Sequence, residues 1–180
     1  MKLKTIKIVA IINIFLISIL THFIYNQYPN IITSILFPIN ESIFEHMKII
    51  FSSILIYGII DYLFLKLNNI KVNNFLLQLV FTSIISIPIF LIIYLPIHFL
   101  LGEYLILTIT LLLITYIISQ LISYYILTKE QLTYSNILLI SLIIIIYIIF
   151  AYLTYNPPKN YFFLDTTTNS YGIYKERVTN

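Results

Sequence analysis

The sequence contains no cysteine and no tryptophan, and only 9% of its 180 residues are charged. The absence of cysteine excludes disulfides and thiolate metal sites. Soluble domains carry about 25% charged residues, whereas this chain is 60% hydrophobic with a mean hydropathy of +0.98. We therefore interpret it as an integral membrane protein. The net charge of +3 is scattered and forms no basic patch, so nucleic acid is not expected as a partner.

Five stretches are apolar over the length of about 20 residues that a spanning helix needs. They cover residues 6–25, 43–65, 75–101, 104–127 and 136–155. The third contains Pro88 and Pro96, which remove backbone donors and tend to kink a helix. We predict an all-α integral membrane protein: a five-helix transmembrane bundle in residues 1–156, with an outer-face loop and a C-terminal cap formed by the tail, residues 157–180.

The distribution of lysine and arginine predicts the orientation of the bundle. With the N-terminus in the cytoplasm, the inner side carries six lysines. The outer connecting loops are then nearly free of cations, and most outer cations lie in the tail: Lys159, Lys175 and Arg177. We therefore predict a multi-pass protein of the cell membrane with a cytoplasmic N-terminus and an extracytoplasmic C-terminus. Sixteen tyrosines are expected to form the aromatic belts at the two interfaces.

This topology brings all three histidines and five of the seven acids to the outer face, Glu103 and Glu176 among them. The densest polar stretch is residues 38–48, PINESIFEHMK, which precede and begin the second span. Pro38 suits an entry turn because it cannot continue a helix. Asn40 or Ser42 can cap the helix that follows.

Two interpretations of this stretch stay open. In the structural one, Ser42 and Glu45 form a capping box in which the Glu45 side chain returns to the Ser42 backbone N–H. In the chemical one, Glu41 and Glu45 are four residues apart and share a helix face. Their repulsion near a membrane then favours protonation of one carboxyl or a cation between them, and Lys48 partly compensates the charge.

The chemical interpretation assigns Glu41, Glu45 and His46 as candidate catalytic residues, with His46 placed to activate the Ser42 hydroxyl. The candidate ligands for a divalent metal such as zinc are His22, Glu45, His46, His98 and Asp165. The same groups suit a proton relay. No ligand spacing is diagnostic of a metal, because the chain has neither an H-x-x-x-H nor an H-E-x-x-H pattern.

Polar residues inside the spans are rarer. Asp61 lies near the inner end of the second span, where we expect it to be solvated at the interface or to contact Gln120. Together with Pro38, Asn40, Ser42 and Lys48, Asp61 completes the set of expected structural residues. In the tail, residues 161–164 are too apolar for water and are expected to lie back on the bundle, which would bring Asp165 near the cluster.

Three elements resemble a family of small, uncharacterised bacterial integral membrane proteins. Residues 37–48, FPINESIFEHMK, are similar to its F-[ST]-P-[VI]-N-E-S-x-W-E-H-x-K signature, with Phe44 in place of tryptophan. Residues 21–25 resemble its L-H-F-x-Y element. Residues 163–173 resemble its F-x-D-P-x-T-G-x-Y-G-I ending, with Thr166 and Asn169 as departures. The resemblance implies several membrane spans with outward-facing motif residues, and no assigned activity.

Three functions are compatible with the sequence. The cluster is a structural clamp or a cation-binding site; or it is the active site of a metal-dependent hydrolase or transferase acting on a lipid-linked substrate; or the chain is a small transporter or a channel-accessory subunit. The lipid bilayer is the one partner that the composition implies. A protein partner and a homo-oligomer are both compatible with the sequence.

Overall fold

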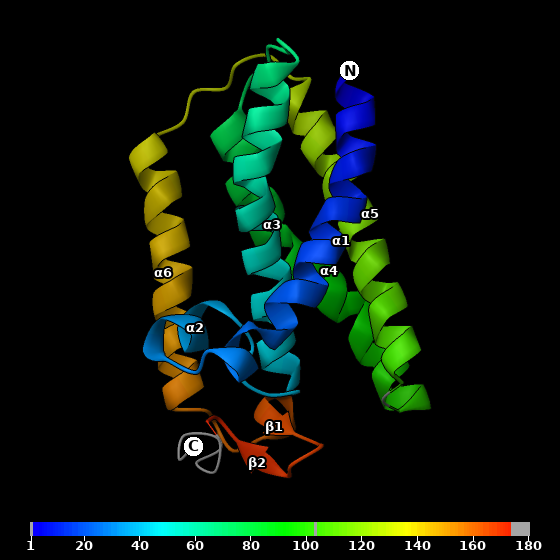
Figure 1. Ribbon diagram of the computed structural model, residues 1–180, viewed down its shortest axis with the longest axis vertical. Coiled ribbons are helices and arrows are strands. Elements are labelled where there is room, and N and C mark those ends of the chain that lie inside the picture. Colours follow the sequence, from blue (N-terminus) through cyan, green and yellow to red (C-terminus); the bar gives the residue numbers. More distant parts are fainter. Residues whose placement is uncertain (1, 103, 174–180) are drawn as a thin grey trace.

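The computed structural model describes residues 2–102 and 104–173. Five long helices run alternately up and down, and all five are long and apolar enough to cross a membrane (Figure 1). Their bounds are Leu3–Gln27 (α1), Ile43–Leu67 (α3), Phe75–Leu101 (α4), Leu105–Leu127 (α5) and Asn136–Tyr155 (α6). These helices coincide with the predicted apolar stretches to within three residues at each end.

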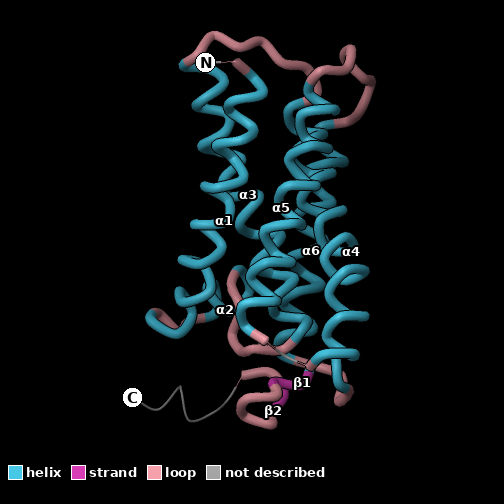
Figure 2. Tube along the Cα trace, turned by 90° about the vertical axis from the view of Figure 1, so that its right-hand side faces the viewer, coloured by secondary structure: helices cyan, strands magenta, loops and turns pink. Residues whose placement is uncertain are grey.

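Four of the helices enclose the main core. Helix α1 packs on α3 and α5, and α4 packs on the same two helices from the other side. Helix α6 stands beside this group and contacts α2 and α4 (Figures 1 and 2). Helix α4 continues unbroken through both of its internal prolines. We call the end of the bundle that carries the N-terminus the N-terminal end, and the opposite end, which carries residues 38–46 and the tail, the motif end.

At the N-terminal end, one asparagine joins two connections that are distant in sequence. Asn74 adopts a left-handed backbone conformation, with φ of +59°, which asparagine tolerates better than most residues. Its side-chain amide donates to the carbonyls of Ile126 and Glu130 and accepts from the Leu132 N–H. The α3–α4 and α5–α6 connections are therefore held together.

A sixth helix, α2 (Ile31–Leu36), is one that hydropathy does not predict. Asn30 caps it through a capping box with Thr33. The segment lies beside α3, because the Lys48 ammonium donates to the Ser34 carbonyl and the Ser52 hydroxyl to the Leu36 carbonyl. Side chains of α3 therefore satisfy two backbone carbonyls of this segment.

The tail lies across the motif end of the bundle (Figure 1). It forms a 3-10 turn, Tyr161–Phe163, and a two-stranded antiparallel hairpin of β1 (Leu164–Asp165) and β2 (Ser170–Tyr171). The ring of Phe163 stacks obliquely on Phe44 of α3, with centroids 4.9 Å apart. The buried apolar contact explains why these residues fold back onto the bundle.

Replacing Gly172 with alanine should detach this tail. Gly172 has φ of +67°, and an added Cβ would lie 3.1 Å from both the Thr154 carbonyl oxygen and Pro157 Cγ. The left-handed conformation alone costs about 1–2 kcal/mol for a residue with a Cβ, and the contact adds to it. Limited proteolysis should cut the Gly172→Ala tail faster. The matched control is Gly102→Ala, since Gly102 has φ of +85° and open space around it. If both variants were cleaved at the same rate, the close packing of Gly172 against Thr154 and Pro157 would not be what holds the tail.

Candidate functional site

A buried ion pair forms the centre of the motif end. The Lys48 ammonium lies 2.6 Å from Glu45 Oε2 and donates to the Ser34 carbonyl at 2.8 Å and to Thr154 Oγ1 at 2.7 Å. Lys48 is fully buried and Glu45 is 2% exposed. An ammonium has three hydrogens, and each one reaches a different element: α2, α3 and α6. We call Glu45, Lys48, Ser34 and Thr154 the clamp.

The carboxylate of Glu45 is satisfied as completely as the ammonium. Its Oε2 also accepts from the Ile39 backbone N–H at 3.0 Å. The expected capping box is therefore wrong in one half: Ser42 Oγ does accept from the Glu45 N–H, but the Glu45 side chain turns to Ile39 instead of to Ser42. The Ser42 N–H donates to Asn40 Oδ1. Lys48 draws the carboxylate inward, because a buried charge needs a counter-charge.

Asn40 connects the motif to the tail. Its side-chain amide donates to the Gly172 carbonyl at 3.0 Å, while its oxygen accepts from Ser42. Pro38 lies in the turn between α2 and α3, as expected of a residue that cannot continue a helix. The residues expected to be structural in this stretch thus hold the entry of α3 against a segment more than 100 residues away in sequence.

Glu41 and Glu45 do not share a helix face. Glu41 lies outside α3 and points toward two histidines, with Oε1 3.2 Å from His22 Nε2 and Oε2 3.9 Å from His46 Nε2. The two imidazole centroids are 6.4 Å apart. The side chains of these three residues are 17–39% exposed. We call His22, Glu41 and His46 the bracket, because two ring nitrogens flank one carboxylate.

The proton positions in the bracket follow from the neighbours of His46. Its Nδ1 lies 2.9 Å from the Ser42 carbonyl oxygen. A carbonyl only accepts, so Nδ1 carries the hydrogen and a neutral ring directs its Nε2 lone pair at the carboxylate. One added proton on Nε2 turns that repulsion into an ion pair. The bracket is therefore arranged to take up a proton.

The electrostatics of the bracket favour an ionised Glu41. The hydrogen bond from His22 lowers the pKa of Glu41 below its ordinary value of 4.5, against the opposing effect of burial. The charges of both histidines lower this pKa further, and the nearby Asp165 carboxylate raises it. Burial raises the pKa of Asp165 as well, but hydrogen bonds from Thr167 and Thr168 outweigh burial and hold that pKa below its usual 3.8.

Residues 1–173 match a family described as a family of unknown function (DUF6512). The chain belongs to this family. The match runs from the start of α1 through the tail hairpin, and it agrees with the resemblance to an uncharacterised family. No curated protein and no solved structure matches the chain.

The five expected metal ligands do not come together. His98 lies apart from the bracket: its Nδ1 pairs with the Tyr94 hydroxyl at 3.0 Å and its Nε2 with the Tyr161 hydroxyl at 2.6 Å. Glu45 belongs to the clamp, and Asp165 holds the hairpin turn through Thr167 and Thr168. Within residues 2–102 and 104–173, no group of three or more His, Asp or Glu side chains is arranged to hold a metal ion. Glu103 and Glu176 lie outside the described residues.

The expected catalytic set divides in the same way. Glu41 and His46 face one another, whereas Glu45 forms an ion pair with Lys48. The expected solvation of Asp61 is wrong: this residue is 2% exposed and forms an ion pair with Lys7 of α1. Sequence reasoning also missed Ser34 and Thr154. Thr154 could have been found because a hydroxyl near the end of an apolar span needs a hydrogen-bond partner. Ser34 could not, because hydropathy does not predict the short helix α2 that carries it.

Proposed function

We propose that the chain is a multi-pass protein of the cell membrane that binds protons at its extracytoplasmic face. The clamp fixes the start of α3, which carries His46 and directly follows Glu41, and α1 supplies His22; these three residues form the proton-binding site. Among the described residues, the bracket has the arrangement that carries the proposal: one carboxylate is flanked by two imidazole nitrogens, and all three side chains are partly exposed to solvent.

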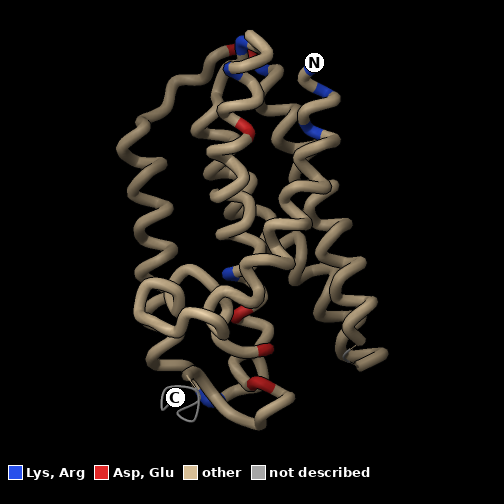
Figure 3. The backbone as a smooth tube through the Cα atoms, viewed as in Figure 1, with Lys and Arg blue, Asp and Glu red and all other residues tan. Residues whose placement is uncertain are grey.

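The charge distribution supports this orientation. Basic residues gather at the N-terminal end, whereas most of the described acids lie at the motif end (Figure 3). The cations of the N-terminal end are Lys2, Lys4, Lys7, Lys66, Lys71 and Lys129. Cytoplasmic loops carry such an excess of lysine. The motif end then faces outward, where the bracket meets the external pH.

The chemistry fits proton binding better than metal-dependent hydrolysis. Imidazole is the side chain that exchanges protons near neutral pH. A catalytic zinc ion uses three protein ligands, and within the described ranges no three His, Asp or Glu side chains are arranged to hold a metal ion. Glu45, the next acid along the chain, is held in the clamp by Lys48.

The titration of Glu41 tests the bracket. With a folded-state pKa below 4.5, Glu41 stabilises the fold above pH 4.5 and loses that contribution as the pH falls through the lower value. His22→Gln removes the His22 charge, which lowers the pKa of Glu41, so Glu41 should take up its proton at a higher pH. Carboxyl carbon NMR of glutamate-labelled protein in nanodiscs, assigned with Glu41→Gln, measures this shift.

The matched control is His98→Gln, which changes the same residue type at a site bonded to Tyr94 and Tyr161 instead of to Glu41. The Glu41 titration should stay as in the unchanged protein. The proposal fails if His22→Gln leaves the Glu41 pKa unchanged, or if both variants move it equally.

A further inference from the structure

The buried polar atoms that make no direct hydrogen bond share one region of the bundle. Among the described residues there are five: Tyr57 Oη, Asp61 Oδ1, Tyr116 Oη, Ser119 Oγ and Gln120 Oε1. All five residues are at most 4% exposed, and they lie on α3 and α5. An unsatisfied polar group costs several kcal/mol inside a membrane. The two tyrosine hydroxyls have polar side chains of α1 and α3 near them, so Asp61 Oδ1, Ser119 Oγ and Gln120 Oε1 are the atoms that most need another partner.

Helix α1 supplies the opposite wall of this region. Lys7 pairs with Asp61, the Tyr57 hydroxyl interacts with Asn13, and the Tyr116 hydroxyl lies near Ser18 and Ser53. We call this polar region between α1, α3 and α5 the seam. Buried serines elsewhere behave differently: Ser83 and Ser86 of α4 donate to carbonyls of their own helix. Burial alone therefore does not leave hydroxyls unsatisfied in this bundle.

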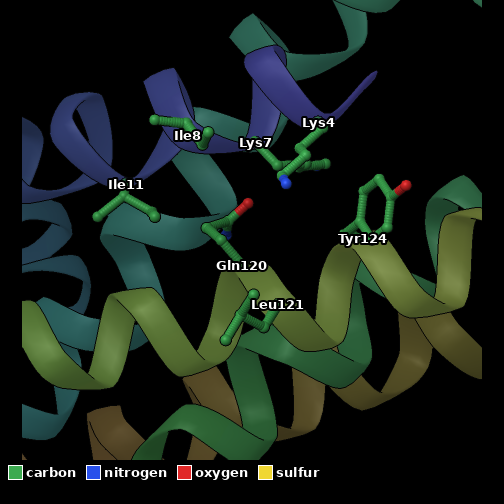
Figure 4. A pocket seen from close by; sticks show the side chains of 7 residues that line it. All are labelled: Lys4, Lys7, Ile8, Ile11, Gln120, Leu121 and Tyr124. Carbon is green, nitrogen blue, oxygen red and sulfur yellow. The ribbon is translucent and has the colours of Figure 1, made fainter. Parts of the chain in front are cut away.

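The seam opens at the N-terminal end. A cavity of about 230 Å³ is lined by both lysines of α1 and by Gln120 of α5. Figure 4 shows the Gln120 side chain turned toward these lysines, Lys4 and Lys7, across the cavity. Gln120 Oε1 is one of the five unsatisfied atoms. The remaining lining residues of the cavity are Ile8, Ile11, Leu121 and Tyr124, so most of the wall is apolar. The cavity still has room for several water molecules beside its three polar residues, since one water needs about 30 Å³.

Toward the motif end the seam continues as far as Thr21. Asp61, Tyr57 and Ser53 are spaced four residues apart on one face of α3, about 6 Å of rise at each step, a gap that one or two waters bridge. The Thr21 hydroxyl lies 3.2 Å from the Ser53 hydroxyl. Thr21 directly precedes His22 in α1. Two buried isoleucines, Ile14 and Ile54, pack against Tyr57 and Tyr116, so the seam is a narrow file rather than an open pore.

We infer that the seam holds a file of water molecules that carries protons between the Lys7–Asp61 pair and the bracket. A proton on Asp61 passes to the adjacent water, and each water or tyrosine hydroxyl accepts one proton and releases another to its neighbour. One proton enters and one leaves, so no covalent change remains. The link to His22 and Glu41 rests on the proposed function, whereas the hydration of the seam does not.

Hydration is measured with a single thiol in this cysteine-free chain. Ser119→Cys is nearly isosteric, and its S–H stretching band is the only one in the infrared spectrum of the protein. In D2O the band should convert to S–D at least about tenfold faster than in Ser83→Cys, whose position is equally buried but satisfied by its own helix. Equal exchange in the two variants would overturn the water file.

Proton transfer is measured with purified protein in vesicles that contain a pH-sensitive dye and a potassium diffusion potential. Asp61→Asn and Tyr116→Phe should each lower the proton flux at least about tenfold, because each removes a proton-exchanging group. Tyr152→Phe, on the exposed face of α6, should not. Size-exclusion profiles show whether each variant is folded. If Asp61→Asn does not fold, Tyr116→Phe still tests the proton path.

The two proposals fail separately. Rapid S–D exchange with no flux above empty vesicles overturns the proton path but leaves the bracket intact. Flux that depends on Asp61 but is unchanged in His22→Gln overturns the connection to the bracket, and the Glu41 titration then decides whether the bracket itself exists. Flux that falls in Tyr152→Phe as much as in Tyr116→Phe also overturns the path.

Discussion

Replacing Lys48 with methionine is expected to lower the free energy of unfolding by about 3–5 kcal/mol, the cost of removing one partner from a buried ion pair. Methionine fills a similar volume but supplies no charge, so the Glu45 carboxylate stays buried without its counter-ion. The Ser34 carbonyl and the Thr154 hydroxyl lose their donor at the same time. Unfolding in mixed micelles with increasing denaturing detergent measures the change.

The double variant separates the lost pair from lost packing. Glu45→Gln combined with Lys48→Met removes both charges and should recover most of the stability, because replacing both partners of a buried pair is often nearly neutral. Lys159→Met, an exposed lysine of the tail, should change stability by less than about 0.5 kcal/mol. A Lys48→Met protein as stable as the Lys159→Met protein would show that the clamp does not hold the fold.

Replacing Lys7 with methionine is expected to cost a similar amount, about 3–5 kcal/mol. Lys7 is 4% exposed, and its partner Asp61 has one carboxylate oxygen without a direct hydrogen bond. Without the ammonium, that carboxylate either takes up a proton or draws water into the seam. The same detergent unfolding assay measures the loss.

Lys4→Met is the matched control, because Lys4 lies one turn earlier on α1 and is exposed. Its stability should stay within about 0.5 kcal/mol of the unchanged protein. Combining Lys7→Met with Asp61→Asn should restore part of the loss. If Lys4→Met and Lys7→Met destabilise equally, the loss reflects the net charge of the N-terminal segment rather than the pair.

Hydropathy determined the five long helices, because each needs only a continuous apolar run, which is a local property of the chain. The motif could be located for a similar reason: acids and histidines are rare in this composition, so their concentration in residues 38–48 stands out. The sequence also placed Pro38 and Asn40 at the entry of α3 through their backbone and capping preferences.

Tertiary structure decided which charged groups meet. Lys48 and Thr154 are 106 residues apart, and Lys7 and Asp61 are 54 apart. Their pairing depends on the depth and rotation at which the helices pack, which hydropathy does not specify. The same packing assigned Glu45 to Lys48 and Glu41 to the histidines, although their spacing alone predicts a shared face. Each buried charge took the partner that the packed helices brought within reach, because an unpaired charge in this interior costs more than any local preference contributes.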